Sequence, residues 1–138
     1  MLLLNARSDA MVASEVKLAL TRADRRQVLL GQNNLDLSAA LVLSPCSSIH
    51  TMFMRFPIDV VFVDRDGRAV RIVTDLSPWR IAVALRAHAV IELPAGTVRA
   101  RDVRLGDELY LMPPASPALK VLRKRTAGLS TRLGGTKP

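Results

Sequence analysis

The sequence of 138 residues is poor in several residue types, and each shortage excludes a class of protein. A single cysteine, Cys46, excludes an internal disulfide as the source of stability. No second cysteine or histidine cluster completes a ligand set of the kind that zinc requires. Aromatic residues make up only 4% of the chain, and they do not alternate with basic residues as in proteins that stack on single-stranded nucleic acid.

Long hydrophobic runs are also missing. The leucines at positions 2–4 are too few for the apolar core of a signal peptide, and no run approaches the roughly 20 residues that span a bilayer. We therefore expect a soluble, cytoplasmic protein whose lone thiol stays reduced. What is present is a high apolar content of 49%, which excludes a disordered chain and is enough for one folded domain.

Acidic residues are absent from the last part of the chain. The net charge is +8, and residues 118–138 hold six basic residues and no acidic one. We interpret residues 1–117 as a single mostly-β domain and residues 118–138 as a basic C-terminal arm, flexible or partly helical. Such an arm attracts an acidic protein or an anionic membrane surface, and nucleic acid is the less favoured partner. The candidate contact residues of the arm are Lys120, Arg123, Lys124 and Arg125.

Short apolar segments alternate with turn signals through the rest of the chain. Because these segments recur about every 8–14 residues, they predict an all-β fold, an antiparallel sandwich or distorted barrel. One short helix is expected at residues 23–30, and Asp64 to Gly67 is typical of a hairpin turn. The expected strands are residues 16–20, 41–43, 58–63, 69–73, 80–85, 87–93, 98–103 and 108–112.

Two blocks of this sequence carry a family resemblance. The first holds Met54, then Asp59 at the start of an apolar strand, then the pair Asp66-Gly67. The second runs from Val90 to Gly96 (Val-Ile-Glu-Leu-Pro-Ala-Gly) and is followed by Leu-Gly-Asp at 105–107. In this order the blocks resemble the family called domain of unknown function 192, over roughly residues 12–112. The resemblance implies a compact, mostly-β fold and no particular reaction.

Two carboxylates lie within otherwise apolar strands. Asp59 lies next to the start of the segment 58–63, and Glu92 lies inside the segment 87–93. Burying such a group without a partner costs several kcal/mol, so each needs a neighbour that explains it. The two form either an acid–base pair or ligand anchor, or two structural groups that accept backbone N–H bonds or pair with arginines.

The segment around the only thiol is a second candidate. In an extended chain His50 and Met54 share one face, and Cys46 precedes them. Thiolate, imidazole and thioether are donors that Cu(I) prefers, but the set is incomplete, so we predict no metal and no cofactor. Cys46 with His50, oriented by Asp59, is also the composition of an activated thiol, although no nucleophile signature surrounds it.

Three functions remain open from these residues. The leading hypothesis is a binding or accessory domain, whose pocket lies where the segment Cys46–Met54 meets Asp59 and Glu92. The second is a small hydrolase that uses either those two carboxylates or Cys46 with His50. The third is a nucleic-acid-associated protein held by the basic arm.

Overall fold

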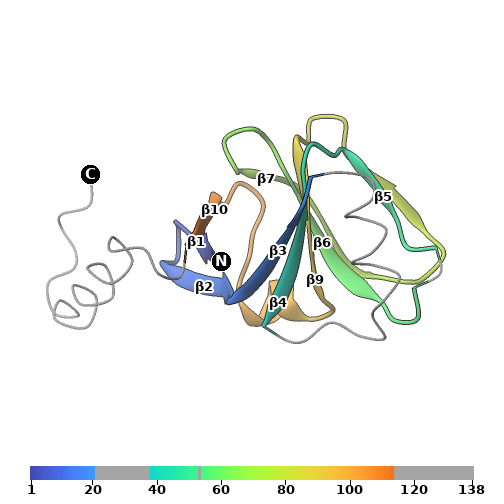
Figure 1. The fold of residues 1–138 in the computed structure, drawn as a ribbon, viewed down its shortest axis with the longest axis horizontal. Helices are drawn as coiled ribbons and strands as arrows, with labels where there is room; N and C mark the ends of the chain where they lie inside the picture. Colours follow the sequence, from blue (N-terminus) through green and yellow to red (C-terminus); the bar gives the residue numbers. More distant parts are fainter. Residues whose placement is uncertain (21–37, 53, 114–138) are drawn as a thin grey trace, which may run out of the picture.

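The computed structural model describes residues 1–20, 38–52 and 54–113 (Figure 1). In this part of the chain the elements are short strands joined by turns. They are, in order, β1 (Leu2–Asn5), β2 (Ala10–Ala13), β3 (Glu15–Ala19), β4 (Ala39–Leu43), β5 (Ser48–His50), β6 (Ile58–Val63), β7 (Ala69–Leu76), β8 (Ile81–Val83), β9 (Ala89–Pro94), the helix α2 (Thr97–Ala100) and β10 (Leu109–Met112).

The centre of the fold is a sheet with the strand order β3-β4-β9-β6-β7. Its middle strands β9 and β6 pair antiparallel, with Val60 opposite Glu92 and Asp59 opposite Leu93. Every residue of these two strands is buried, on both faces of the sheet. A strand covered on both faces is expected to be apolar throughout, as β6 nearly is. Any polar side chain on β6 or β9 is therefore placed in the protein interior.

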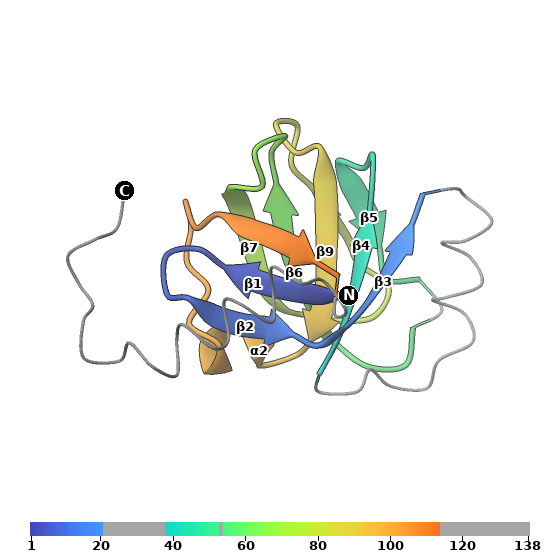
Figure 2. The ribbon, with the colours of Figure 1, turned by 60° about the vertical axis from the view of Figure 1, so that its left-hand side comes forward.

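Each face of this sheet is covered by a smaller sheet (Figures 1 and 2). On one face lies the sheet β10-β1-β2, and the space between is filled by what we call the terminal-side core. On the other lies the two-stranded ribbon β5-β8, over the ribbon-side core. The terminal-side core includes Leu3, Val12, Val61, Ile91, Leu93 and Leu109. The ribbon-side core includes Leu41, Ile49, Ile58, Val60, Phe62, Ala82 and Val90.

The all-β, sandwich-like fold predicted from the sequence is confirmed. The hairpin at residues 64–67 forms as expected, since the Asp64 carboxylate accepts the backbone N–H groups of Asp66 and Arg68 at 2.9 and 3.0 Å. One strand pair differs from the expected antiparallel arrangement, because β3 and β4 are parallel. Parallel strands need a long connection between them, and β3 ends at Ala19 whereas β4 begins at Ala39.

A second difference concerns the expected strand at residues 98–103, where the structure has the short helix α2. The cause is a tertiary contact, since the carboxylate of Asp59 accepts the backbone N–H groups of Gly96 and Val98 at 3.0 and 2.9 Å. These are groups that the first turn of a helix leaves without an internal partner. An acceptor from β6 thus favours a helical turn over the local alternation of apolar residues.

Several predictions from the sequence lie outside the described residues. They are the helix at 23–30, the domain boundary at residue 117 and the arm at 118–138. Within the described residues, no helix is long and apolar enough to cross a membrane. The cytoplasmic location stays a prediction.

Gly67 in the hairpin provides a test of this packing. Its φ is +81°, and a Cβ atom built there would lie 2.5 Å from the backbone oxygen of Leu109. We expect Gly67→Ala to lower the free energy of unfolding by about 2–5 kcal/mol, from the left-handed backbone and the clash together. Gly106→Ala is the matched control, since Gly106 also has positive φ but has open space around it. Equal losses in urea denaturation of the two variants would contradict the packing at Gly67.

Candidate functional site

Asp59 is a structural anchor in this fold. Its side chain is buried, and its two carboxylate oxygens accept three backbone N–H groups. Asp75 donates to Oδ1 at 2.9 Å, and Gly96 and Val98 donate to Oδ2. Hydrogen bonds to a charged acceptor are about twice as strong as neutral ones, so this group fixes the end of β7 and the start of α2 together. This is the second of the two interpretations that the sequence left open.

Glu92 is the opposite case. Its side chain is 1% exposed, and neither carboxylate oxygen has a hydrogen-bond partner among the described residues. Burial raises the pKa of the Glu92 carboxyl from its ordinary 4.5 to about 8. An uncharged carboxyl costs far less to bury than a carboxylate, so Glu92 is predominantly protonated at neutral pH.

The register separates these two groups. Residues directly opposite each other on paired strands share one face of the sheet. Glu92 is opposite Val60 and Leu41, which both belong to the ribbon-side core. Asp59 is opposite Leu93, which belongs to the terminal-side core. The two carboxyl groups therefore point to opposite faces of the central sheet, and the acid–base pair that the sequence suggested does not form.

The candidate residues around Cys46 also point in different directions. Cys46 and Met54 are half-buried and pack against the ribbon-side core, on the Glu92 side of the sheet. The Cys46 thiol donates to the carbonyl oxygen of Ser48 at 3.0 Å. His50 is exposed on the outer face of β5, next to buried Ile49, so it points away from that core. Within the described residues, no three His, Cys, Asp or Glu side chains are grouped so that they could hold a metal ion.

Thr51 is a buried polar residue that the sequence did not single out. Its hydroxyl donates to the carbonyl oxygen of Ser77 at 2.6 Å and accepts the backbone N–H of Arg80 at 2.9 Å. Its own carbonyl oxygen accepts the N–H of Trp79 at 2.9 Å. These bonds hold the 77–80 turn against β5. No local motif predicts them, because the partners lie 26–29 residues away along the chain.

Asp107, in the Leu-Gly-Asp motif, is also structural. Its side chain is buried. Its carboxylate accepts hydrogen bonds from Nε of Arg7 at 2.6 Å, from Nδ2 of Asn5 at 2.8 Å and from the backbone N–H of Arg104 at 2.7 Å. Burial alone would raise the pKa of Asp107, but the hydrogen bonds from Arg7, Arg104 and Asn5 outweigh it and lower that pKa. The motif thus ties the loop before β10 to the end of β1.

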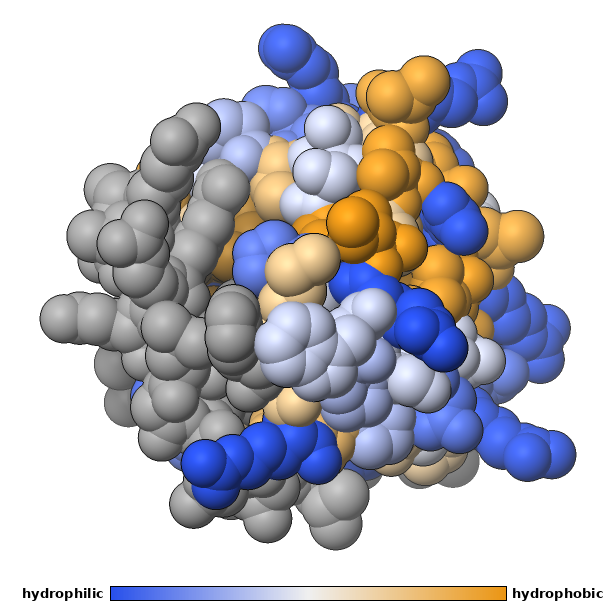
Figure 3. All heavy atoms as spheres, turned by 90° about the vertical axis from the view of Figure 1, so that its right-hand side faces the viewer, coloured by the Kyte–Doolittle hydropathy of each residue, from blue (hydrophilic) through white to orange (hydrophobic). Residues whose placement is uncertain are grey.

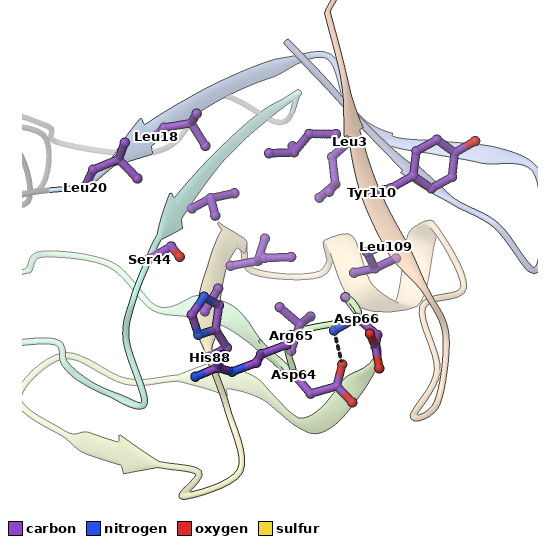
Figure 4. A pocket seen from close by; sticks show the side chains of 16 residues that line it. Leu3, Leu18, Leu20, Ser44, Asp64, Arg65, Asp66, His88, Leu109 and Tyr110 are labelled. Atoms are coloured by element: carbon purple, nitrogen blue, oxygen red, sulfur yellow. Dashed lines mark hydrogen bonds between the residues drawn. The ribbon is translucent and has the colours of Figure 1, made fainter.

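An open cleft lies on the face of the central sheet that carries the terminal-side core, opposite to the face that carries Glu92 (Figure 4). It has a volume of about 420 Å³, and its lining is mostly apolar. Leu18 and Leu20 stand at one side of it and Leu3 and Leu109 at the other. The polar residues of the lining are Ser44, Asp64, Arg65, Asp66, His88 and Tyr110. Asp59, Glu92 and Cys46 do not line this cleft, so it is not the pocket that the sequence suggested.

Comparison with known proteins places the chain in a family. The model of the family called domain of unknown function 192, described as "Uncharacterized ACR", matches residues 4–111. A UPF0127 protein of Thermococcus kodakarensis is 30% identical over 128 residues, which cover 89% of this chain and 81% of the relative. The chain belongs to this family. The resemblance noted over roughly residues 12–112 is thereby confirmed.

Other relatives match over shorter segments or by fold. A UPF0127 protein of Pyrococcus furiosus is 41% identical over 64 residues, 46% of this chain and 54% of the relative, so that match spans about half of the relative's length. A proposed transcription regulator from Sinorhizobium meliloti has a TM-score of 0.67 at 24% identity, over 79% of this chain and 89% of that one. A protein of unknown function from Novosphingobium aromaticivorans has a TM-score of 0.70 at 18% identity, over 80% and 84%. The likeness to these two structures shows the fold alone.

The raised pKa of Glu92 makes the stability of the fold depend on pH. Below about pH 4.5 the carboxyl is protonated in both the folded and the unfolded chain. As the pH rises to about 8, the unfolded chain releases this proton and the folded chain retains it, so the free energy of unfolding falls. Above that pH the loss is complete. We expect it to be on the order of 5 kcal/mol, and to be missing in Glu92→Gln.

Urea denaturation over this pH range measures the effect. Glu15→Gln, a change at an exposed position of β3, is the matched control and should follow the unmodified protein. Parallel curves for the unmodified protein and Glu92→Gln would show that Glu92 is ionised or solvated in the folded state.

Proposed function

We propose that this protein is a binding or accessory domain, and that its ligand occupies the open cleft between the end of the central sheet and the β1–β10 pair. The observation that carries the proposal is the cleft itself, a mostly apolar hollow of about 420 Å³. That size lies within the range of small-molecule sites, which are typically apolar with a few polar groups for orientation. The separation of Asp59 from Glu92 supports binding over acid–base catalysis.

The lining indicates a ligand with an apolar body and one polar end. Leu3, Leu18 and Leu109 would contact the body. Arg65 and His88 are polar residues of the lining (Figure 4), and they would contact an anionic end. Arginine is well suited to this because its planar guanidinium donates two parallel hydrogen bonds to a carboxylate or a sulfonate.

The dye anilinonaphthalene sulfonate has this chemistry and serves as the probe. We expect its fluorescence to increase in the presence of the folded protein. Ala89→Leu, which places a larger side chain in the lining, and Arg65→Gln should each weaken binding about tenfold, by loss of space and of the anion contact respectively. The measurement is a fluorescence titration at fixed salt concentration.

Leu105→Ser is the control for this titration, because Leu105 is an exposed apolar residue outside the cleft. It should leave the affinity for the dye unchanged. The proposal is contradicted if Ala89→Leu and Arg65→Gln bind the dye as tightly as the unmodified protein does.

One observation favours the hydrolase alternative. Glu92 retains a proton at neutral pH and shares its side of the sheet with Cys46 and Met54, as an acid catalyst in an apolar pocket would. The alternative pair, Cys46 with His50, is not hydrogen-bonded in this structure, since the thiol donates to Ser48. A hydrolase screen with the unmodified protein decides between binding and hydrolysis. Activity that Glu92→Gln removes while circular dichroism shows an intact fold would replace the binding proposal.

The basic arm is the second part of the proposed function. We infer that Lys120, Arg123, Lys124 and Arg125 bring the domain to an acidic protein or an anionic surface, and nucleic acid is the alternative partner. This inference rests on charge alone, because residues 118–138 contain six basic residues and no acidic one.

Neutralising the four arm residues to Gln in the full chain tests this role. For duplex DNA as the anionic probe, we expect weaker binding and a salt dependence shallower by about three to four units in log–log slope. The control neutralises four exposed residues of the folded part, Lys17, Arg68, Arg99 and Arg101, and so removes the same charge. Equal losses in both variants would mean that net charge, not the arm, attracts the probe.

A further inference from the structure

The outer face of the β5-β8 ribbon exposes an unusual number of large apolar side chains. Leu85 is 90% exposed, Ile81 64%, Trp79 56% and Val83 40%. Met52, just after β5, is exposed as well. Figure 3 looks onto this side of the molecule and shows a continuous hydrophobic area bordered by hydrophilic side chains. We call Trp79, Ile81, Val83 and Leu85 the ribbon patch.

The fold does not need Ile81 and Val83 to be apolar. Ile49 of β5 and Ala82 of β8 face the ribbon-side core. Since side chains alternate along a strand, Ile81 and Val83 must point outward, where they lie opposite His50 and Ser48. Exposed apolar residues that stand alone need no explanation, but a contiguous group of them marks a contact surface.

The two segments that form the ribbon carry charge of one sign. No acidic residue occurs in residues 37–58 or 76–91, the two segments that contain β5 and β8. Arg80 and Arg86 are exposed within and beside the patch. Arg71 of β7 is exposed too, and its guanidinium donates to the carbonyl oxygen of Val83. Apolar contacts and positive charge are therefore combined on one face.

This combination of apolar and basic side chains limits the kinds of partner that the ribbon patch can bind. A second copy of the chain would bring arginines against arginines, which like-charge repulsion disfavours. An acidic protein would match the charge, but it would also need a pocket for side chains that project as far as Leu85. A bilayer of anionic lipids needs no such pocket, because its interface admits projecting apolar groups and attracts basic ones. Tryptophan is itself enriched at that interface.

We infer that the ribbon patch is a docking surface for an anionic lipid bilayer. Ile81, Val83 and Leu85 enter the region between headgroups and acyl chains, and Trp79 lies at the headgroup level. Arg80 and Arg86 contact lipid phosphates. This inference depends neither on the residues that line the cleft nor on those of the basic arm.

The chain contains one tryptophan, and it belongs to the patch, so its fluorescence reports the contact directly. The probe is vesicles of phosphatidylcholine, with or without phosphatidylglycerol. With the anionic vesicles we expect Trp79 emission to shift to shorter wavelength and to be quenched by brominated lipid. With phosphatidylcholine alone we expect no shift.

Three variants of the full chain sharpen the test. Ile81→Ser with Leu85→Ser should weaken vesicle binding at least about tenfold, through loss of inserted apolar surface. Arg80→Gln with Arg86→Gln should weaken binding to the anionic vesicles by a similar factor, through loss of contacts to lipid phosphates. Leu105→Ser is the matched control, since Leu105 is an exposed leucine before β10, 66% exposed and far along the chain from the ribbon. Circular dichroism of each variant verifies its fold.

Four results would overturn the inference. The first is equal binding to neutral and anionic vesicles. The second is vesicle binding that leaves Trp79 emission unchanged and disappears when the four arm residues are neutralised, which would assign the contact to the arm. The third is a Trp79 shift with an acidic amphipathic peptide but none with vesicles. The fourth is a shift that depends on protein concentration alone, with a dimer seen in sedimentation.

Discussion

The constraint on which this structure depends is that its two central strands are covered on both faces. β6 and β9 lie between the terminal-side core and the ribbon-side core, and every one of their residues is buried. A carboxyl group on such a strand must either find donors or lose its charge. Asp59 and Glu92 represent these two solutions, one with three backbone N–H donors and one with a raised pKa.

The three hydrogen bonds that Asp59 accepts also determine part of the topology. Its donors come from the end of β7 and from the residues around the start of α2, so one side chain joins segments that are far apart in sequence. A charged hydrogen bond contributes about 1.5–3 kcal/mol, which makes three of them a large fraction of the stability of a domain of this size. An aspartate in this position thus indicates a structural requirement before it indicates catalysis.

How far the sequence could predict this fold depends on the range of the interactions. β6 was predicted with its correct ends, because six apolar, largely β-branched residues in a row need only local propensity. The short strands β1, β2 and β5 were missed, and β1 is paired with β10 from the other end of the chain. The alternation of side chains within each strand predicts which of its own neighbours share a face with Asp59, and likewise with Glu92. Only the register of β6 against β9 shows that the two face apart, and register between distant strands is not written in either strand alone.

The same layering separates the two surfaces on which a function can be built. The cleft draws on residues of the terminal-side core and on β1 and β10, whereas the ribbon patch lies beyond the ribbon-side core, with the central sheet between them. A ligand in the cleft and a surface bound at the ribbon would therefore not compete sterically. Because Asp59 and Asp107 are committed to backbone and arginine contacts, mutations that alter binding should fall on the exposed rims of these surfaces, where side chains change at small cost in stability. A fold of this kind separates the residues that hold it together from those free to specify a partner.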